Sequence, residues 1–145
     1  CGCALLFRAN VPSKIGLIDP RFFILWEETD WCYRARRAGY RIMIEPKAKV
    51  WHKVSQTFDG GGRGEKYVYY YSRNQLLWVE KNLRGEERLR CLVRCLRPLC
   101  RQALKLMRGK VPQEERAIIR ARLLGAFHYV IRRFGPAPSF KRGVS

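Results

Sequence analysis

Residues 26 to 42 of this 145-residue chain read WEETDWCYRARRAGYRI, with three carboxylates among positions 27 to 30. These are Glu27, Glu28 and Asp30, and they stand directly before a pattern that predicts a helix ending at Gly39. Acidic side chains at a helix start are favoured by the unpaired N–H groups and by the positive end of the helix dipole. The stretch therefore predicts a helix with an acidic cluster at its N-terminus, where a general base can be held.

Short strands are predicted on both sides of this helix. Residues 40 to 45 alternate apolar and polar side chains until Pro46 ends the run, and residues 48 to 53 predict a second strand. In this second strand His52 lies on the apolar side. Near the start of the chain, residues 3 to 8 form an apolar run that predicts a short buried strand.

A glycine-rich segment over residues 55 to 64 predicts a mobile loop, and a long helix is predicted after it. This helix covers residues 65 to 82 and carries an apolar stripe at helical spacing that includes Asn74, with Arg73 at the edge of the stripe. A buried amide needs hydrogen-bond partners. Asn74 and Arg73 are therefore candidates both for fixing the packing of the helix and for contacting a substrate.

Residues 84 to 145 predict a basic helical extension, with 16 Lys and Arg side chains against 4 Asp and Glu. A helix over residues 89 to 108 has an apolar face and a parallel basic face, and we expect Pro98 to kink or break it. Another helix is predicted from Pro112 to about Phe134. The extension fits either a helical pair with a solvated polar face or attachment to an anionic membrane surface.

The whole chain is strongly basic, with 30 Lys and Arg, 12 Asp and Glu and a formal net charge of +18. This charge indicates an anionic partner, which can be a nucleic acid, an acidic lipid or a phosphorylated substrate. The six cysteines have no regular spacing, so we expect reduced thiols rather than a disulfide framework. No uncharged apolar run approaches the ~20 residues that span a bilayer.

Several of these segments together resemble the C-terminal half of a family 2 glycosyltransferase with the GT-A fold, of the rhamnosyltransferase-like kind. The resemblance covers residues 2 to about 83. It is carried by the strand at residues 2 to 8, the segment GLIDPRFF at 16 to 23, the EETD motif with its RAGYR continuation, the Trp51-His52 pair and the YSRN motif at 71 to 74.

The resemblance implies an α/β fold class. Residues 1 to 83 are expected to form the acceptor-side part of a Rossmann-like GT-A domain, and residues 84 to 145 the helical extension. The nucleotide-binding half of such a domain, with its Asp-x-Asp metal motif, is not in this sequence, and we expect it upstream.

The activity that the resemblance implies is an inverting transfer from a nucleotide-sugar donor to the hydroxyl of a glycan or lipid-linked acceptor, in polysaccharide or glycolipid synthesis. The family's general base corresponds to Glu28, where the family usually has Asp, and Asp30 is kept as the alternative base. Glu27 and Trp31 are expected to contact the substrate. Such a transferase is expected in the cytoplasm, peripheral at the inner face of the cell membrane.

The resemblance also implies that Arg73 and Asn74 contact substrate or diphosphate, and that His52 assists a divalent metal such as Mg²⁺ or Mn²⁺. All of these candidate site residues have an alternative structural role. The acidic cluster can simply favour the start of its helix, His52 can be a semi-buried histidine, and Arg73 and Asn74 can fix helix packing. The rival functions are a basic nucleic-acid-binding module and a non-catalytic interaction module. Because no nucleic-acid recognition motif is present, we expect no nucleic-acid partner.

Overall fold

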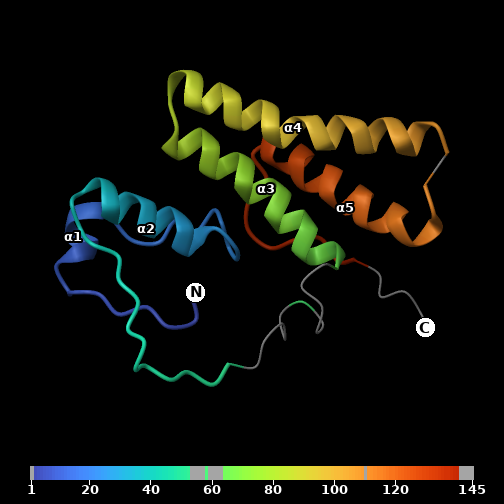
Figure 1. Cartoon of the computed structure of the whole chain (residues 1–145). Helices are drawn as coiled ribbons and strands as arrows, with labels where there is room; N and C mark the ends of the chain where they lie inside the picture. Colours follow the sequence, from blue (N-terminus) through green and yellow to red (C-terminus); the bar gives the residue numbers. More distant parts are fainter. Residues whose placement is uncertain (1, 53–57, 59–63, 110, 141–145) are drawn as a thin grey trace.

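A computed structural model describes residues 2–52, 58, 64–109 and 111–140, without the side chain of Glu114 (Figure 1). Within these residues the regular secondary structure is helical, with irregular segments between the helices and no β-strand. The helices are α1 (Val11–Ile15), α2 (Glu27–Arg37), α3 (Glu65–Asn82), α4 (Gly85–Met107) and α5 (Gln113–Val130).

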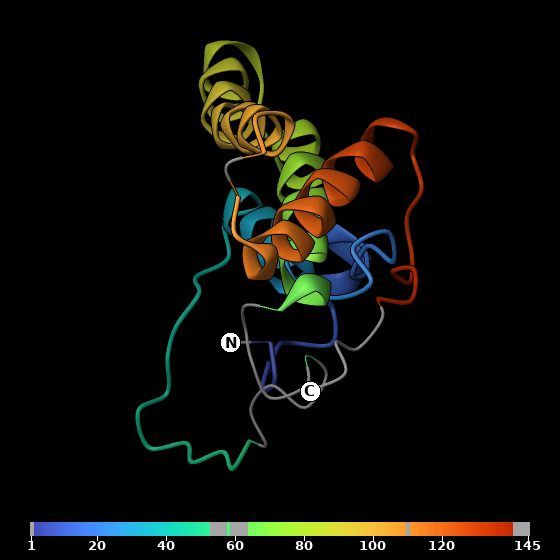
Figure 2. The same ribbon diagram turned by 90° about the vertical axis from the view of Figure 1, so that its right-hand side faces the viewer.

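The expectation of an α/β, GT-A-like fold is therefore wrong for this chain. Residues 3 to 8 and 40 to 52 have no strand pairing, and in both views the latter segment runs away from the helices (Figures 1 and 2). A strand requires the N–H and C=O groups of a neighbouring strand, and no described residue supplies them here. As a result, apolar residues that were predicted to face a sheet are largely solvent-exposed, including Ile44 and Val50.

Helices α3, α4 and α5 form one body, in which α4 crosses above α3 and α5 (Figures 1 and 2). Their core is built around Val68, Tyr69 and Tyr70 of α3 and Ala121 of α5. Helix α5 crosses α3 so closely that a Cβ atom at Gly125 would overlap the carbonyl oxygen of Tyr69. Only glycine allows this separation between the two backbones.

Tyr69 and His128 form the buried polar contact between α3 and α5. The Tyr69 hydroxyl lies 2.7 Å from Nδ1 of His128, which is only 4% exposed. Burial, with smaller contributions from Arg133 and Arg73, lowers the pKa of His128. The imidazole is therefore neutral at physiological pH, so it joins the two helices without adding a buried charge.

We predicted that Pro98 would either kink or break its helix. Helix α4 continues through Pro98, so the proline does not break it. Helix α5 ends at Val130, four residues before the predicted end. None of the helices in the described ranges is long and apolar enough to cross a membrane.

The N-terminal helices are tied to α3 by polar contacts. Asp30 of α2 accepts a hydrogen bond from Lys81 of α3, and Arg34 of α2 donates to the carbonyl oxygens of Ile15 and Leu17. These contacts hold α1, α2 and the loop between them against one end of α3.

Candidate functional site

The loop directly before α2 has an unusual backbone conformation. Phe23, Leu25 and Trp26 have φ values of 63°, 66° and 73°, in the left-handed region that non-glycine residues rarely occupy. Each such residue costs on the order of 1 kcal/mol or more, and strained residues of this kind cluster at functional sites. The strain here lies immediately in front of Glu27 and Glu28, the first two residues of α2.

Asn74 of α3 holds this loop in place. Its amide nitrogen lies 2.8 Å from each of the carbonyl oxygens of Phe22, Ile24 and Leu25, and its side chain is fully buried. The two N–H groups of the amide are shared among these carbonyls, and the Phe22 carbonyl also accepts from the backbone N–H of Ile24. The structure thus gives Asn74 the packing role that was one of its two predicted alternatives.

Arg73 supports the same loop from the neighbouring position. Its Nη2 donates to the carbonyl of Phe22 at 3.0 Å, its Nη1 to the carbonyl of Gly135 at 2.7 Å, and its Nε to Oδ1 of Asn74 at 2.9 Å. The side chain is completely buried, with its guanidinium 5.0 Å from the ring centre of Tyr70. Because its side chain is buried and its donors are engaged with backbone carbonyls and with Asn74, Arg73 is not placed to bind a diphosphate.

Glu27 and Glu28 differ from every other acidic side chain described. Both are half-buried, and in each the Oε2 atom is buried without a hydrogen-bond partner among the described residues. Burial raises the pKa of Glu27, and the charge of Glu28 adds to the rise, although a backbone hydrogen bond opposes it. A carboxylate oxygen without a hydrogen-bond donor is a candidate for proton exchange with any ligand that reaches it.

Asp30 has a different environment from its two acidic neighbours. It is fully buried, and its Oδ2 accepts hydrogen bonds from Lys81 Nζ at 2.8 Å and Arg34 Nε at 2.9 Å. Its Oδ1 accepts a third bond, of 2.9 Å, from Asn82. Because both of its oxygens are engaged by cations and an amide, Asp30 offers no free oxygen to a ligand and ties α2 to α3.

Trp31 is also placed as a structural residue rather than a substrate contact. Its side chain is 5% exposed, its indole nitrogen donates to the carbonyl of Gly16 at 3.0 Å, and its ring lies 4.8 Å from the ring of Phe7. The indole thereby fixes the segment that follows α1 against α2.

His52 has no described bond to the acidic pair. It is exposed within the irregular segment after α2, and no described hydrogen bond or ion pair joins it to Glu27 or Glu28. Within the part of the chain that the structure describes, no three His, Cys, Asp or Glu side chains are grouped so that they could hold a metal ion. No Mg²⁺ or Mn²⁺ site is therefore assigned among the described residues, and the expected role of His52 stays a prediction.

An aromatic group beside the acidic pair was not predicted as part of a site. The ring of Trp26 lies 5.7 Å from that of Trp78 and 5.5 Å from that of Tyr71, and Trp78 also contacts Tyr33 at 5.1 Å. The indole nitrogen of Trp78 is buried and has no described partner. Tyr71 and Trp78 are seven residues apart on α3, a spacing that places them on one helix face.

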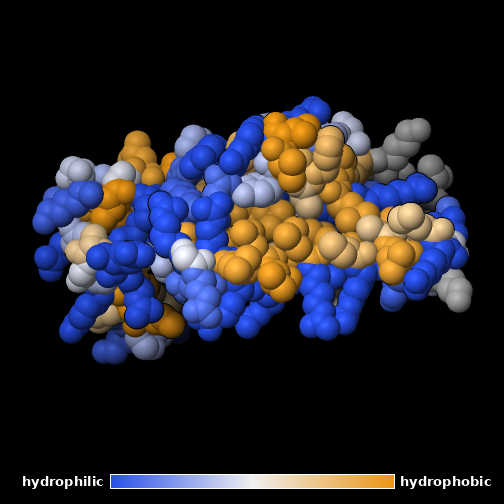
Figure 3. Space-filling model, turned by 90° about the horizontal axis from the view of Figure 1, so that it is seen from above, coloured by the Kyte–Doolittle hydropathy of each residue, from blue (hydrophilic) through white to orange (hydrophobic). Residues whose placement is uncertain are grey.

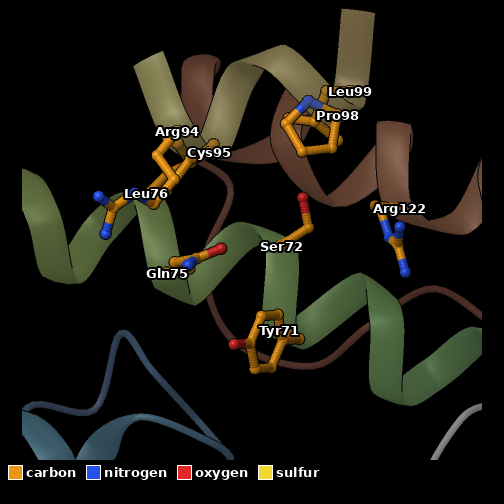
Figure 4. A pocket seen from close by; sticks show the side chains of 9 residues that line it. All are labelled: Tyr71, Ser72, Gln75, Leu76, Arg94, Cys95, Pro98, Leu99 and Arg122. Carbon is orange, nitrogen blue, oxygen red and sulfur yellow. The ribbon is translucent and has the colours of Figure 1, made fainter. Parts of the chain in front are cut away.

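A cavity of about 260 Å³ lies elsewhere, between α3, α4 and α5 (Figure 4). Ser72 and Gln75 line it from α3, Arg94 and Cys95 from α4, and Arg122 from α5. Burial raises the pKa of the Cys95 thiol, which makes it a poor nucleophile at neutral pH. None of the predicted site residues lines this cavity.

Comparison of the chain with protein-family models, with curated proteins and with solved structures finds no match. The interpretation of the site accordingly depends on the geometry of its own residues.

Proposed function

We propose that this chain supplies the acceptor-side residues of an inverting glycosyltransferase, which moves a sugar from a nucleotide-sugar donor to the hydroxyl of a glycan or a lipid-linked acceptor. The observation that supports this proposal best is the pair of half-buried glutamates at the start of α2, each with an unpartnered carboxylate oxygen. The sequence resemblance around the same residues also supports the activity, while the GT-A fold that it implied is not formed by the described residues.

In the proposed reaction Glu28 is the general base. Its carboxylate removes the proton from the acceptor hydroxyl while the hydroxyl oxygen forms a bond to the anomeric carbon of the donor sugar. The bond between that carbon and the diphosphate oxygen breaks at the same time, and the nucleoside diphosphate leaves from the opposite side. A positioned base of this kind contributes about 10²–10⁴-fold to a rate.

Glu27 is proposed to orient the acceptor. Because burial raises the pKa of Glu27, this carboxyl retains its proton to a higher pH than an exposed glutamate and can donate a hydrogen bond to an acceptor oxygen. Trp26 and Trp78 lie next to this position and present apolar surface of the kind on which a sugar ring packs. Asp30, Arg73 and Asn74 are positioning residues in this proposal.

The proposal assigns only the acceptor side to the described residues. Binding of the donor nucleotide, and of any divalent metal, is assigned to residues outside them. We place the activity in the cytoplasm, in keeping with the free thiols of Cys32, Cys91, Cys95 and Cys100.

The experiment measures sugar transfer by the longest natural chain that contains these residues, using matched glutamate variants. Glu28→Gln keeps size and hydrogen-bonding capacity but cannot accept the proton, so we expect kcat to fall by about 10²–10⁴-fold with little change in the donor KM. Glu27→Gln should raise the acceptor KM more than it lowers kcat. Glu86→Gln, at an exposed glutamate in the first turn of α4, is the control.

Full transfer activity in Glu28→Gln would remove this residue as the base. Loss of activity in Glu27→Gln with normal activity in Glu28→Gln would assign the base to the neighbouring carboxylate. If the wild-type protein transfers no sugar from any nucleotide-sugar donor, the proposed function is wrong.

A further inference from the structure

Helix α4 has an apolar side that no described residue covers. Leu89, Val93, Leu96, Leu104 and Met107 are between 44% and 83% exposed, and they recur at helical spacing over nearly the full length of the helix. Only Leu99 of this helix is buried, where α4 packs on the rest of the helical body. An exposed apolar row of this length is uncommon on a monomeric protein and indicates an interaction surface.

A row of arginines runs beside these apolar residues on the same helix. Arg90, Arg97 and Arg101 are all exposed, and they border an open groove of about 510 Å³ together with Leu89 and Val93. No acidic residue occurs between positions 88 and 113. Seen from the side on which α4 lies, the molecule shows an apolar patch in orange that is bordered by hydrophilic side chains in blue (Figure 3).

We propose that α4 docks the protein onto the surface of an anionic lipid bilayer. In this arrangement the helix lies along the membrane plane, with the row from Leu89 to Met107 inserted among the upper acyl chains. The adjacent arginines reach the negatively charged headgroups. Interfacial helices combine an apolar face, a basic polar face and insufficient hydrophobicity to span the bilayer, and α4 has all three properties.

The charge and the apolar row of α4 together favour an anionic bilayer over a second copy of the chain or a nucleic acid. A second copy of the chain carries the same net charge of +18, so two α4 surfaces would repel each other. A nucleic acid would engage the arginines but would leave Leu96, Leu104 and Met107 in water. An anionic bilayer offers negative charge at its surface and hydrocarbon beneath it, so it satisfies both rows.

Sedimentation with lipid vesicles tests the proposal on the intact chain. We expect the protein to sediment with vesicles of equal parts phosphatidylglycerol and phosphatidylcholine, and not with vesicles of phosphatidylcholine alone. The inference does not depend on sugar transfer, because binding is measured without any donor or acceptor.

Two sets of variants separate the two rows of α4. Replacing Arg90, Arg97 and Arg101 with Gln should weaken binding about 100-fold at low salt, since each basic residue adds to the attraction of an anionic surface. Val93→Gln with Leu96→Gln keeps the charge and good helix formers, and should weaken binding at least tenfold. The matched control replaces three exposed arginines in and after α2 with Gln, namely Arg36, Arg37 and Arg41. This variant loses the same charge away from α4, and its binding should stay within about threefold of wild type.

Circular dichroism confirms that each variant is folded before it is compared. Normal vesicle binding by the Val93→Gln, Leu96→Gln variant would overturn the proposal, because charge alone would then account for binding. Equal losses in the α4 and α2 arginine variants would overturn it as well. Tight RNA or DNA binding together with no binding to anionic vesicles would replace the bilayer by a nucleic acid as the partner.

Discussion

The side-chain amide nitrogen of Asn74 lies 2.8 Å from the carbonyl oxygen of Leu25, a residue whose φ is 66°. A fully buried amide on α3 therefore holds a strained backbone two residues before the acidic pair of α2. A backbone in this conformation persists only where its surroundings enforce it. Asn74 does so with two N–H donors that are shared among three loop carbonyls, and Arg73 adds a bond to the Phe22 carbonyl.

Removing this amide should relax the loop and weaken the fold. We expect Asn74→Ala to lower the free energy of unfolding by about 2–4 kcal/mol, because buried carbonyls lose their partner and the strain is no longer opposed. Urea unfolding measures the loss. Gln75→Ala, at the neighbouring half-buried amide, is the control and should cost less than about 1 kcal/mol. Similar values for the two variants would contradict the role given to Asn74.

Asp30 should matter for stability more than any exposed carboxylate. Asp30→Ala leaves Lys81 and Arg34 without their buried acceptor, and we expect a loss of about 2–3 kcal/mol in the free energy of unfolding. This expected loss is smaller than for a fully buried ion pair, because the side chains of Arg34 and Lys81 are 20% and 24% exposed. Glu86→Ala, which breaks the exposed pair with Arg90, should change stability by less than about 0.5 kcal/mol. A double-mutant cycle with Lys81→Met would measure the coupling, and a coupling near zero would contradict the ion pair.

Glu27 should give the protein a pH dependence of stability with a defined sign. Because burial raises its pKa above the ordinary 4.5, the folded protein favours the protonated form. Its contribution is fully present below pH 4.5 and is lost as the pH rises through the folded pKa. Glu27→Gln, which mimics the protonated form, should therefore raise the free energy of unfolding near neutral pH and leave it unchanged below pH 4.5. A constant difference across this range would contradict the prediction.

Asp19 should show the opposite sign. Hydrogen bonds from Arg21, and then from Lys81, hold the pKa of this carboxyl well below its usual value of 3.8. Its contribution is present above pH 3.8 and is lost as the pH falls through the folded pKa. Asp19→Asn should thus destabilise the protein near neutral pH, and the difference from wild type should shrink on acidification. Unfolding curves recorded across the acid range measure this trend, and a difference that grows toward low pH would refute it.

The close crossing of α3 and α5 makes a further prediction about a single methyl group. Gly125→Ala places a Cβ atom against the carbonyl oxygen of Tyr69, where backbone rather than a flexible side chain must move. We expect a loss of about 2–3 kcal/mol and a fall in melting temperature of roughly 5–10 °C. Arg120→Ala, at an exposed position of the same helix, should stay within about 0.5 kcal/mol of wild type. Equal melting temperatures for Gly125→Ala and wild type would show that the helices can separate without cost.

Local sequence patterns predicted the helices well and the strands badly. The predicted helix over residues 65 to 82 is α3, with the same bounds, because its apolar side chains recur with a period that fits only a helix. The alternation over residues 40 to 45 is equally regular, yet these residues form no strand. A helix satisfies its own backbone hydrogen bonds, whereas a strand depends on a neighbour that no described segment of this chain provides.

For the candidate site, the sequence by itself determined where the acidic side chains gather and that a helix begins beside them, since both properties depend on neighbouring residues. Only the tertiary structure separated the roles of the three carboxylates. Asp30 is engaged by Lys81 and Asn82, which are 51 and 52 residues away, while Glu27 and Glu28 keep an unpartnered oxygen. The pKa and the availability of a carboxylate are set by the charges, donors and burial around it, and those surroundings come from parts of the chain that meet only when it folds.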